Sequence, residues 1–230
     1  MPQVMPVLTP DLLLCAYASG LFPMANDRHD PTIHWIDPRR RGVLPLHQFH
    51  QPKSLRKVVR RGQFEIRVDS DFAQVIEACA EIRAARPRTW LNDELIELYR
   101  SLHRRGYAHS VEAWTGGRLV GGLYGVSLGA AFFGESMFTR TRDASKIALV
   151  ALVERLRAGG YRLLDTQFVT DHLRQFGAIE IAREQYHREL RRALAVPAVF
   201  YSDAGAVVSG TPWTPSVDAM GSAQSTTQMS

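Results

Sequence analysis

The sequence predicts an α+β fold in which antiparallel strands come first, followed by a buried helix and another strand. Three strand-like segments are joined by short turns that contain glycine, which is typical of an antiparallel meander; they cover residues 109–114, 118–126 and 130–135. Residues 143–158 are then expected to form a helix, and residues 147–153 within it include no polar residue. A helix that is apolar on all sides is a buried helix. The strand that carries Asp165 and Gln167 follows it.

Length and composition are those of an ordinary globular protein. The chain has 230 residues, of which 45% are hydrophobic and 22% charged, enough for one large domain or a domain with a smaller partner. Its two cysteines, Cys15 and Cys79, have no metal-binding or disulfide-framework spacing, so a reducing compartment is expected. No apolar run approaches the ~18–20 residues that span a bilayer, and no secretory signal is recognisable. The prediction is a cytoplasmic protein.

The first part of the chain is expected to form a small basic N-terminal domain, residues 1–62. Thr9 is a suitable N-cap and Pro10 a suitable first residue for a helix that ends at Gly20. Three short segments are expected after this helix: an ordered loop at residues 21–24, a strand at residues 33–36, and a turn with a basic cluster at residues 37–42.

Positive charge is concentrated in residues 39–67. This segment has nine Lys or Arg residues and one acid, a net charge of +8, whereas the whole chain carries +5. Five of the cations recur at helical spacing: Lys53, Arg56, Lys57, Arg60 and Arg61. The apolar side of this expected helix would consist of Leu55, Val58 and Val59. One interpretation is a solvated helix face. The other is contact with phosphates, because clustered Lys and Arg are the electrostatic signature of nucleic-acid binding.

The larger domain is expected at residues 63–200. Asp71 can cap a helix that runs to about Arg83, and Asn92 can cap another that ends at Gly106. The remaining segments are a strand at residues 64–68, helices at residues 171–176 and 186–194, and a polar, partly disordered tail at residues 201–230.

This order of elements is that of the acyltransferase fold of the N-acetyltransferases, in which two neighbouring strands splay apart and leave a cleft. The splayed pair would be the strand that ends at Glu135 and the strand that carries Asp165 and Gln167. Alternate residues of a strand share a face, so the two polar side chains can act together. The sequence therefore predicts that all three residues lie at one cleft.

A coenzyme A cofactor is not expected. Enzymes that use coenzyme A hold its pyrophosphate with a glycine-rich loop at the start of the helix after the splayed strand. Residues 139–146 occupy that place and contain no glycine. A coenzyme A-dependent N-acetyltransferase is therefore the weaker alternative, and no metal or other cofactor is predicted.

Several segments, in order, resemble the bacterial leucyl/phenylalanyl-tRNA–protein transferase family. They extend from about residue 9 to 195, which makes the match more specific than any single short motif. The segments are residues 16–23 (AYASGLFP), 89–90 (TW), 103–112, 121–126 (GGLYGV), 133–138 (FGESMF), 144–146 (ASK) and 165–167 (DTQ). The resemblance implies transfer of Leu or Phe, and less well Met, from aminoacyl-tRNA to the N-terminal Lys or Arg of acceptor proteins, which marks them for degradation.

The resemblance also implies roles for individual residues. Asp165 and Gln167 would be the polar pair at the reacting ester, and Glu135 a carboxylate beside the acceptor. The apolar pocket for the transferred side chain would be lined by Phe132, Leu123 and Leu164. Trp90 would stack on the terminal adenine, opposite Met24 where many members have Trp, and Tyr17 belongs to the same substrate-binding set.

The mechanism is left with alternatives. The aminoacyl ester is already activated, so the chemistry needs no ATP. Asp165 can orient Gln167 or take a proton, and Gln167 can hold either the attacking amine or the ester carbonyl. A polar network with only a structural role is the alternative for this pair. For the whole chain, the further alternative is a non-catalytic RNA-binding module.

Overall fold

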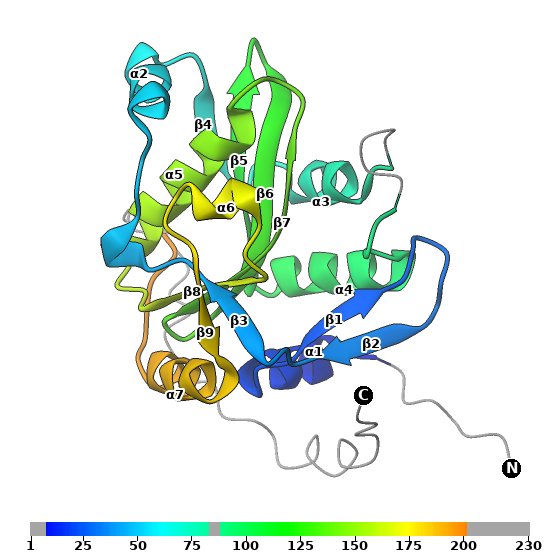
Figure 1. Cartoon of the computed structure of the whole chain (residues 1–230). Helices are drawn as coiled ribbons and strands as arrows, with labels where there is room; N and C mark the ends of the chain where they lie inside the picture. The colour runs from blue at the N-terminus through cyan, green and yellow to red at the C-terminus, as the bar shows by residue number, and fades with distance from the viewer. Residues whose placement is uncertain (1–7, 83–87, 202–230) are drawn as a thin grey trace, which may run out of the picture.

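The computed structural model describes residues 8–82 and 88–201 as a mixed α/β molecule with one large and one small sheet (Figure 1). The helices are α1 Pro10–Ala18, α2 Lys53–Arg61, α3 Phe72–Ala80, α4 Asp93–Arg104, α5 Ala144–Ala158, α6 Asp171–Arg174 and α7 Arg183–Leu194, with a 3-10 turn at Leu46–Gln48. The strands are β1 Phe22–Ala25, β2 Ile33–Ile36, β3 Arg40–Val43, β4 Glu65–Val68, β5 Ala108–Thr115, β6 Arg118–Leu128, β7 Ala131–Thr139, β8 Leu163–Gln167 and β9 Ile179–Ala182. The predicted polar tail lies beyond Tyr201, outside the described residues.

The large sheet has seven strands in the order β4-β5-β6-β7-β8-β3-β9. The predicted meander is confirmed, because β5, β6 and β7 pair antiparallel in sequence order. β7 and β8 are parallel, and α5 is the crossover helix between them. A Cβ atom on Gly121 would lie 2.5 Å from the Cβ of Ala144, so the glycine allows the start of α5 to pack directly on β6.

Apolar side chains pack on both faces of the large sheet. One core lies against α1, α3, α4 and α7 and includes Tyr17, Tyr99 and Phe133. The other lies against α5 and α2 and includes Leu55 and Phe132. Figure 1 shows α5 on one side of the strands and α3 and α4 on the other. The predicted burial of α5 is confirmed. Among the described residues, none of the helices has the length and apolar character needed to span a bilayer.

β7 and β8 separate after three residue pairs. The first of these pairs joins Ala131 to Leu163, and the last joins Phe133 to Asp165. β7 then continues beside β6 to Thr139, whereas β8 ends at Gln167. This divergence is the predicted splay. The N-acetyltransferase-like class itself stays a prediction.

Several segment predictions are wrong. The expected loop at residues 21–24 is largely strand β1, which pairs with β2. The expected turn and basic cluster at residues 37–42 includes β3, which lies between β8 and β9 in the large sheet. β3 is only four residues long and begins with two arginines, so its partners, rather than its own pattern, make it a strand. β9 is not among the strands that the sequence predicts. α3 ends at Ala80 instead of continuing to about residue 83.

Candidate active site

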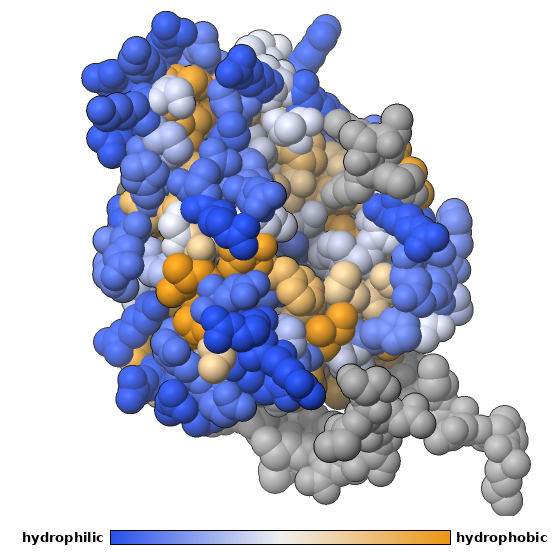
Figure 2. Space-filling view, viewed as in Figure 1, coloured by the Kyte–Doolittle hydropathy of each residue, from blue (hydrophilic) through white to orange (hydrophobic). Residues whose placement is uncertain are grey.

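A cleft of about 690 Å³ opens where β7 and β8 diverge. Its walls come from β1, β6, β7, the first half of α5, the end of β8 and the segment that leads into α6. Figure 2 shows a hollow on this face with apolar residues at its edge. The splay produces the cleft, because side chains of β7 beyond Phe133 have no β8 neighbour to cover them.

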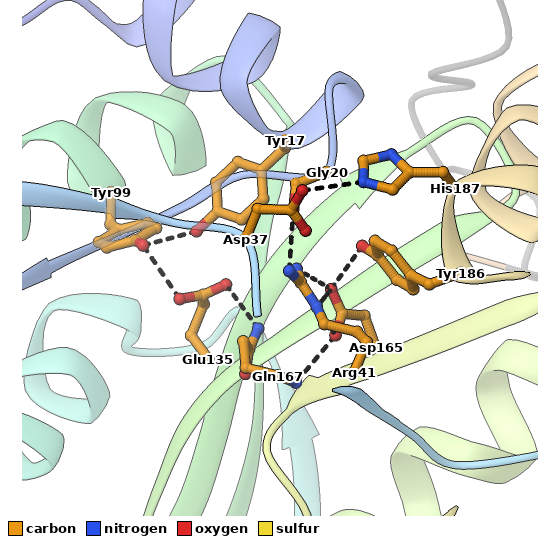
Figure 3. A network of polar contacts seen from close by, with 10 residues as sticks. All are labelled: Tyr17, Gly20, Asp37, Arg41, Tyr99, Glu135, Asp165, Gln167, Tyr186 and His187. Atoms are coloured by element: carbon orange, nitrogen blue, oxygen red, sulfur yellow. Dashed lines mark hydrogen bonds and ion pairs between the residues drawn. The ribbon is translucent and has the colours of Figure 1, made fainter. Parts of the chain in front are cut away.

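The three polar residues predicted for the cleft lie together (Figure 3). The side-chain amide of Gln167 donates to Glu135 Oε1 at 3.3 Å. The backbone N–H of Gln167 donates to Asp165 Oδ1 at 2.8 Å. Gln167 thus connects the two carboxylates, and both Gln167 and Glu135 line the cleft.

A β-bulge sets the direction of the Glu135 side chain. In the β6–β7 register Gly125 pairs with Gly134 and Tyr124 pairs with Ser136, so Glu135 is the extra residue. A Cβ atom on Gly125 would lie 2.3 Å from the carbonyl oxygen of Phe133, so only a glycine fits beside the bulge. The prediction that the strand ends at Glu135 is wrong. The strand continues to Thr139, and the bulge turns Glu135 toward α4.

Two tyrosines support Glu135 from behind. Tyr99 donates its hydroxyl proton to Glu135 Oε2 at 3.0 Å, and the hydroxyl oxygens of Tyr17 and Tyr99 are 2.6 Å apart. The pKa of Glu135 is raised to about 8. Burial is the largest cause and the charge of Asp165 also raises the pKa, whereas the hydrogen bonds with the tyrosine hydroxyls lower it. Glu135 therefore changes between its protonated and ionised forms near pH 8.

Asp165 is fully buried and its oxygens are occupied by donors. It accepts from Arg41 Nε at 3.0 Å, from Arg41 Nη2 at 2.6 Å and from the Tyr186 hydroxyl at 2.8 Å, besides the Gln167 N–H. A carboxylate enclosed in this way orients Gln167. The alternative role, taking a proton from the substrate, has no geometric support, because Asp165 does not reach the cleft surface.

Arg41 is a buried member of this network that the sequence did not identify. It belongs to the predicted basic cluster at residues 37–42, but it is fully buried and paired with Asp165. One signal was available, since an Asp within the apolar strand Leu163–Gln167 requires a buried partner. That signal does not say which of the chain's many cations the partner is.

Two of the three residues predicted for the apolar pocket line the cleft. Leu123 and Leu164 line the cleft, together with Leu149 and Leu152 of α5. Phe132 does not line it: the ring is fully buried and stacks on Phe200 at 5.5 Å. The physical reason is that Phe132 lies in the part of β7 that is still paired with β8.

Both predicted adenine contacts lie at the cleft, whereas Tyr17, which was predicted only as a substrate-binding residue, does not. Trp90 and Met24 both line it, and the bond from Ala25 N–H to the Trp90 carbonyl at 2.9 Å holds β1 beside Trp90. Trp90 also packs edge-on against Tyr99, with ring centroids 6.3 Å apart. Tyr17 is fully buried and contacts Tyr99 instead, so it supports the site from behind.

The five predicted tRNA-contacting cations lie on α2, away from the cleft lining. All five are exposed, and Leu55 anchors the helix in the α5 core. Val59, expected on the packed side, is 40% exposed. Two further cations, Arg142 and Lys146, line the cleft itself near the start of α5, where Lys146 pairs with Asp143 at 2.8 Å.

Comparisons with known proteins agree along the chain. Residues 7–39 match the family model "Leucyl/phenylalanyl-tRNA protein transferase N-terminal domain", and residues 43–191 match "Leucyl/phenylalanyl-tRNA protein transferase". Proteins named leucyl/phenylalanyl-tRNA–protein transferase from Paramagnetospirillum magneticum and Caulobacter vibrioides are each 60% identical over 193 residues. The match covers 84% of this chain and 92% and 89% of those proteins.

Among solved structures, the C-terminal domain of a putative lysylphosphatidylglycerol synthetase from Agrobacterium fabrum is similar at a TM-score of 0.37 and 14% identity. That alignment covers 70% of this chain and 52% of the other. A likeness this weak carries no argument about function. The family models and the 60% identical relatives do: the chain belongs to the leucyl/phenylalanyl-tRNA–protein transferase family, whose members are aminoacyltransferases.

Proposed function

We propose that the protein transfers Leu or Phe, and Met less well, from aminoacyl-tRNA to the N-terminal Lys or Arg of acceptor proteins. The added residue marks the acceptor for degradation by the N-end rule. One observation carries this proposal: a single cleft combines an apolar wall, a polar amide and a half-buried carboxylate. The cytoplasm is the proposed location, because aminoacyl-tRNA is the proposed donor.

The reaction exchanges an ester for an amide. The acceptor's α-amino nitrogen attacks the ester carbonyl carbon, and the bond from that carbon to the ribose oxygen breaks. One amine proton passes to that oxygen, which is released as the ribose hydroxyl. An α-amino pKa near ~7.7–8.0 leaves a useful fraction of the amine neutral. Holding both substrates in line can remove roughly 7–11 kcal/mol from the barrier. Positioning is therefore the main contribution proposed for the cleft.

Each polar residue of the cleft has a proposed part. Glu135 pairs with the cationic side chain of the acceptor, for which a charge-assisted hydrogen bond contributes roughly 1.5–3 kcal/mol. Gln167 holds the amine or the ester carbonyl, and Asp165 orients Gln167. The apolar wall, with Leu123 and Leu164, receives the transferred side chain.

The remaining contacts are proposed for the tRNA. Trp90 and Met24 enclose the terminal adenine, because an indole ring and a thioether both pack well on a base. The α2 cations contact phosphates further along the tRNA. The N-acetyltransferase-like fold belongs to this proposal as well, with the tRNA ester in place of a coenzyme A thioester.

The test is transfer of labelled Leu from charged tRNA to a peptide that begins with Arg. The expected result is labelled peptide, with much less label on a matched peptide that begins with Glu. Acetyl-coenzyme A serves as the control donor and is expected neither to bind in calorimetry nor to acetylate the peptide. Tight tRNA binding without any labelled peptide would instead indicate an RNA-binding module.

A further inference from the structure

Arg41 and Asp165 form an ion pair in which both side chains are fully buried. Two charges removed from water gain little net stability even when they are paired. An apolar pair of similar volume would serve the core as well. The pair must therefore be explained by what it holds in place.

The guanidinium group of Arg41 is fixed on all sides. Its Nη1 donates to the carbonyl oxygen of Gly20 at 2.8 Å, and Nε and Nη2 grip Asp165 (Figure 3). The rings of Phe22 and Tyr186 enclose it, with centroids 4.5 and 4.3 Å from the guanidinium carbon. These contacts come from α1's end, β1, α7 and β8, so Arg41 has one orientation, and so does the carboxylate it binds.

Asp165 passes that orientation to Gln167. Gln167 has a backbone φ of +55°, a left-handed conformation that residues other than glycine seldom adopt. The bond from its N–H to Asp165 Oδ1 at 2.8 Å holds the backbone there. In this conformation the Gln167 amide points across the cleft to Glu135, where it donates at 3.3 Å.

We propose that Arg41 is a positioning residue for the transfer reaction: by clamping Asp165 it fixes the left-handed turn at Gln167 and so aims the Gln167 amide at the reacting centre. Arg41 itself does not touch the substrates. This inference rests on the proposed function, because it requires Gln167 to act in transfer.

The first experiment is Arg41→Lys, which keeps the charge but loses the planar, two-point grip on the carboxylate. We expect kcat to fall about 10- to 100-fold, the loss typical of a slightly misplaced reacting group. The KM for the peptide and the Kd for tRNA should change less than about twofold. Arg40→Lys is the matched control, since Arg40 is the neighbouring, exposed residue of β3 and pairs with Glu180. It should keep the wild-type kcat.

A second comparison separates positioning from general structural support. In a Gln167→Ala background, Arg41→Lys should cost less than about twofold more in kcat, because the group it positions is already absent. If the double variant instead lost kcat by the product of the two single losses, the residues would act independently and the proposal would be overturned. A wild-type kcat for Arg41→Lys would also overturn it.

A third variant covers the case in which Arg41→Lys does not fold. Arg41→Met combined with Asp165→Leu removes both charges and keeps the volume, a change that cores tolerate. We expect it to fold and to have the kcat of Gln167→Ala; a folded protein with wild-type kcat would overturn the proposal. The proposed function is judged separately, since it fails only if the wild type and Arg40→Lys transfer no Leu.

Discussion

At the scale of single residues, the site has two carboxylates that lie in different surroundings. Asp165 is enclosed by Arg41, Tyr186 and the Gln167 N–H. Glu135 faces the cleft, with a pKa raised to about 8 by burial. Two acids in different environments can take separate roles: Asp165 holds Gln167 through a hydrogen bond, and Glu135 changes charge near pH 8.

Glu135→Gln should weaken use of the acceptor while leaving use of the donor intact. The amide keeps the shape but removes the charge that would pair with N-terminal Arg, so the KM for an Arg-started peptide should rise about 10- to 150-fold. The KM for aminoacyl-tRNA should change little. Steady-state kinetics with each substrate varied separately measures both, and equal losses on both substrates would contradict the acceptor role.

The raised pKa of Glu135 predicts how the activities of the wild type and of Glu135→Gln depend on pH. Glu135 binds a cation only when it is ionised, and ionisation occurs as the pH rises through about 8. For the wild type, kcat/KM for the Arg-started peptide should therefore rise through that range. With both enzymes the acceptor amine also titrates in this pH range. The Glu135→Gln profile therefore shows how much of the pH dependence of kcat/KM comes from the amine. Identical profiles would show that Glu135 does not titrate in the free enzyme.

Asp165→Ala should destabilise the fold far more than Gln167→Ala does. The first substitution leaves Arg41 buried without its carboxylate, a change that costs about 3–5 kcal/mol. The second removes a side chain at the cleft surface and should cost about 1 kcal/mol or less. Thermal unfolding of both variants measures the difference. Similar melting temperatures would mean that water or another group replaces the Asp165 carboxylate.

At the scale of elements, the site depends on irregularities in two strands. β7 carries a bulge at Glu135, and β8 ends in a left-handed residue at Gln167. Each irregularity turns one polar side chain toward the other, just beyond the point where the strands separate. Regular strands with the same sequence would place Glu135 and Gln167 according to their alternation alone.

The α2 helix gives a prediction at this scale. Lys53→Gln with Lys57→Gln removes two exposed cations but keeps the basic last turn that favours the helix end. If these lysines contact phosphate, tRNA binding should weaken and its salt slope should flatten by about 1 per lysine. Arg188→Gln with Arg192→Gln on α7 removes the same exposed charge and is the control. Equal slopes for the two double variants would make α2 a solvated face.

At the scale of the whole molecule, the N-terminal part and the larger part are joined through one sheet. β3 precedes the expected boundary at residue 62 but lies between β8 and β9. One family model ends at residue 39 and the other begins at residue 43, so their division falls at β3. β3 also supplies Arg41, so the site is completed by a strand from early in the chain.

Residues 63–201 alone should therefore fail to fold cooperatively. Without β3, both β8 and β9 lose the strand that lies between them and pairs with each, and Asp165 is buried without Arg41. Residues 8–201 are the control and should unfold in one cooperative transition. Circular dichroism during heating checks both fragments. A cooperative transition of residues 63–201 near that of the control would show that the boundary at residue 62 separates two independent domains.

The sequence by itself determined the features that depend on local pattern. Apolar spacing and turn residues indicated the meander, the buried helix and the strand with Asp165, and their order indicated the splay. Because alternate residues share a strand face, the sequence placed Asp165 and Gln167 together with Glu135; Glu135 and Gln167 line the cleft, whereas Asp165 is buried behind it. The family motifs added Trp90, Leu123 and Leu164, which line that cleft.

Only the tertiary structure decided how these residues are held. Arg41 and Asp165 are 124 residues apart in sequence, and no local spacing links a short arginine-rich segment to a distant strand. The bulge at Glu135 arises from pairing with β6. Phe132 is buried where it stacks on Phe200, and Tyr17 where it packs on Phe133 and meets the Tyr99 hydroxyl. Local periodicity fixes which face a side chain takes. Which partner it meets there depends on contacts between distant segments, and these exist only once the sheet is assembled.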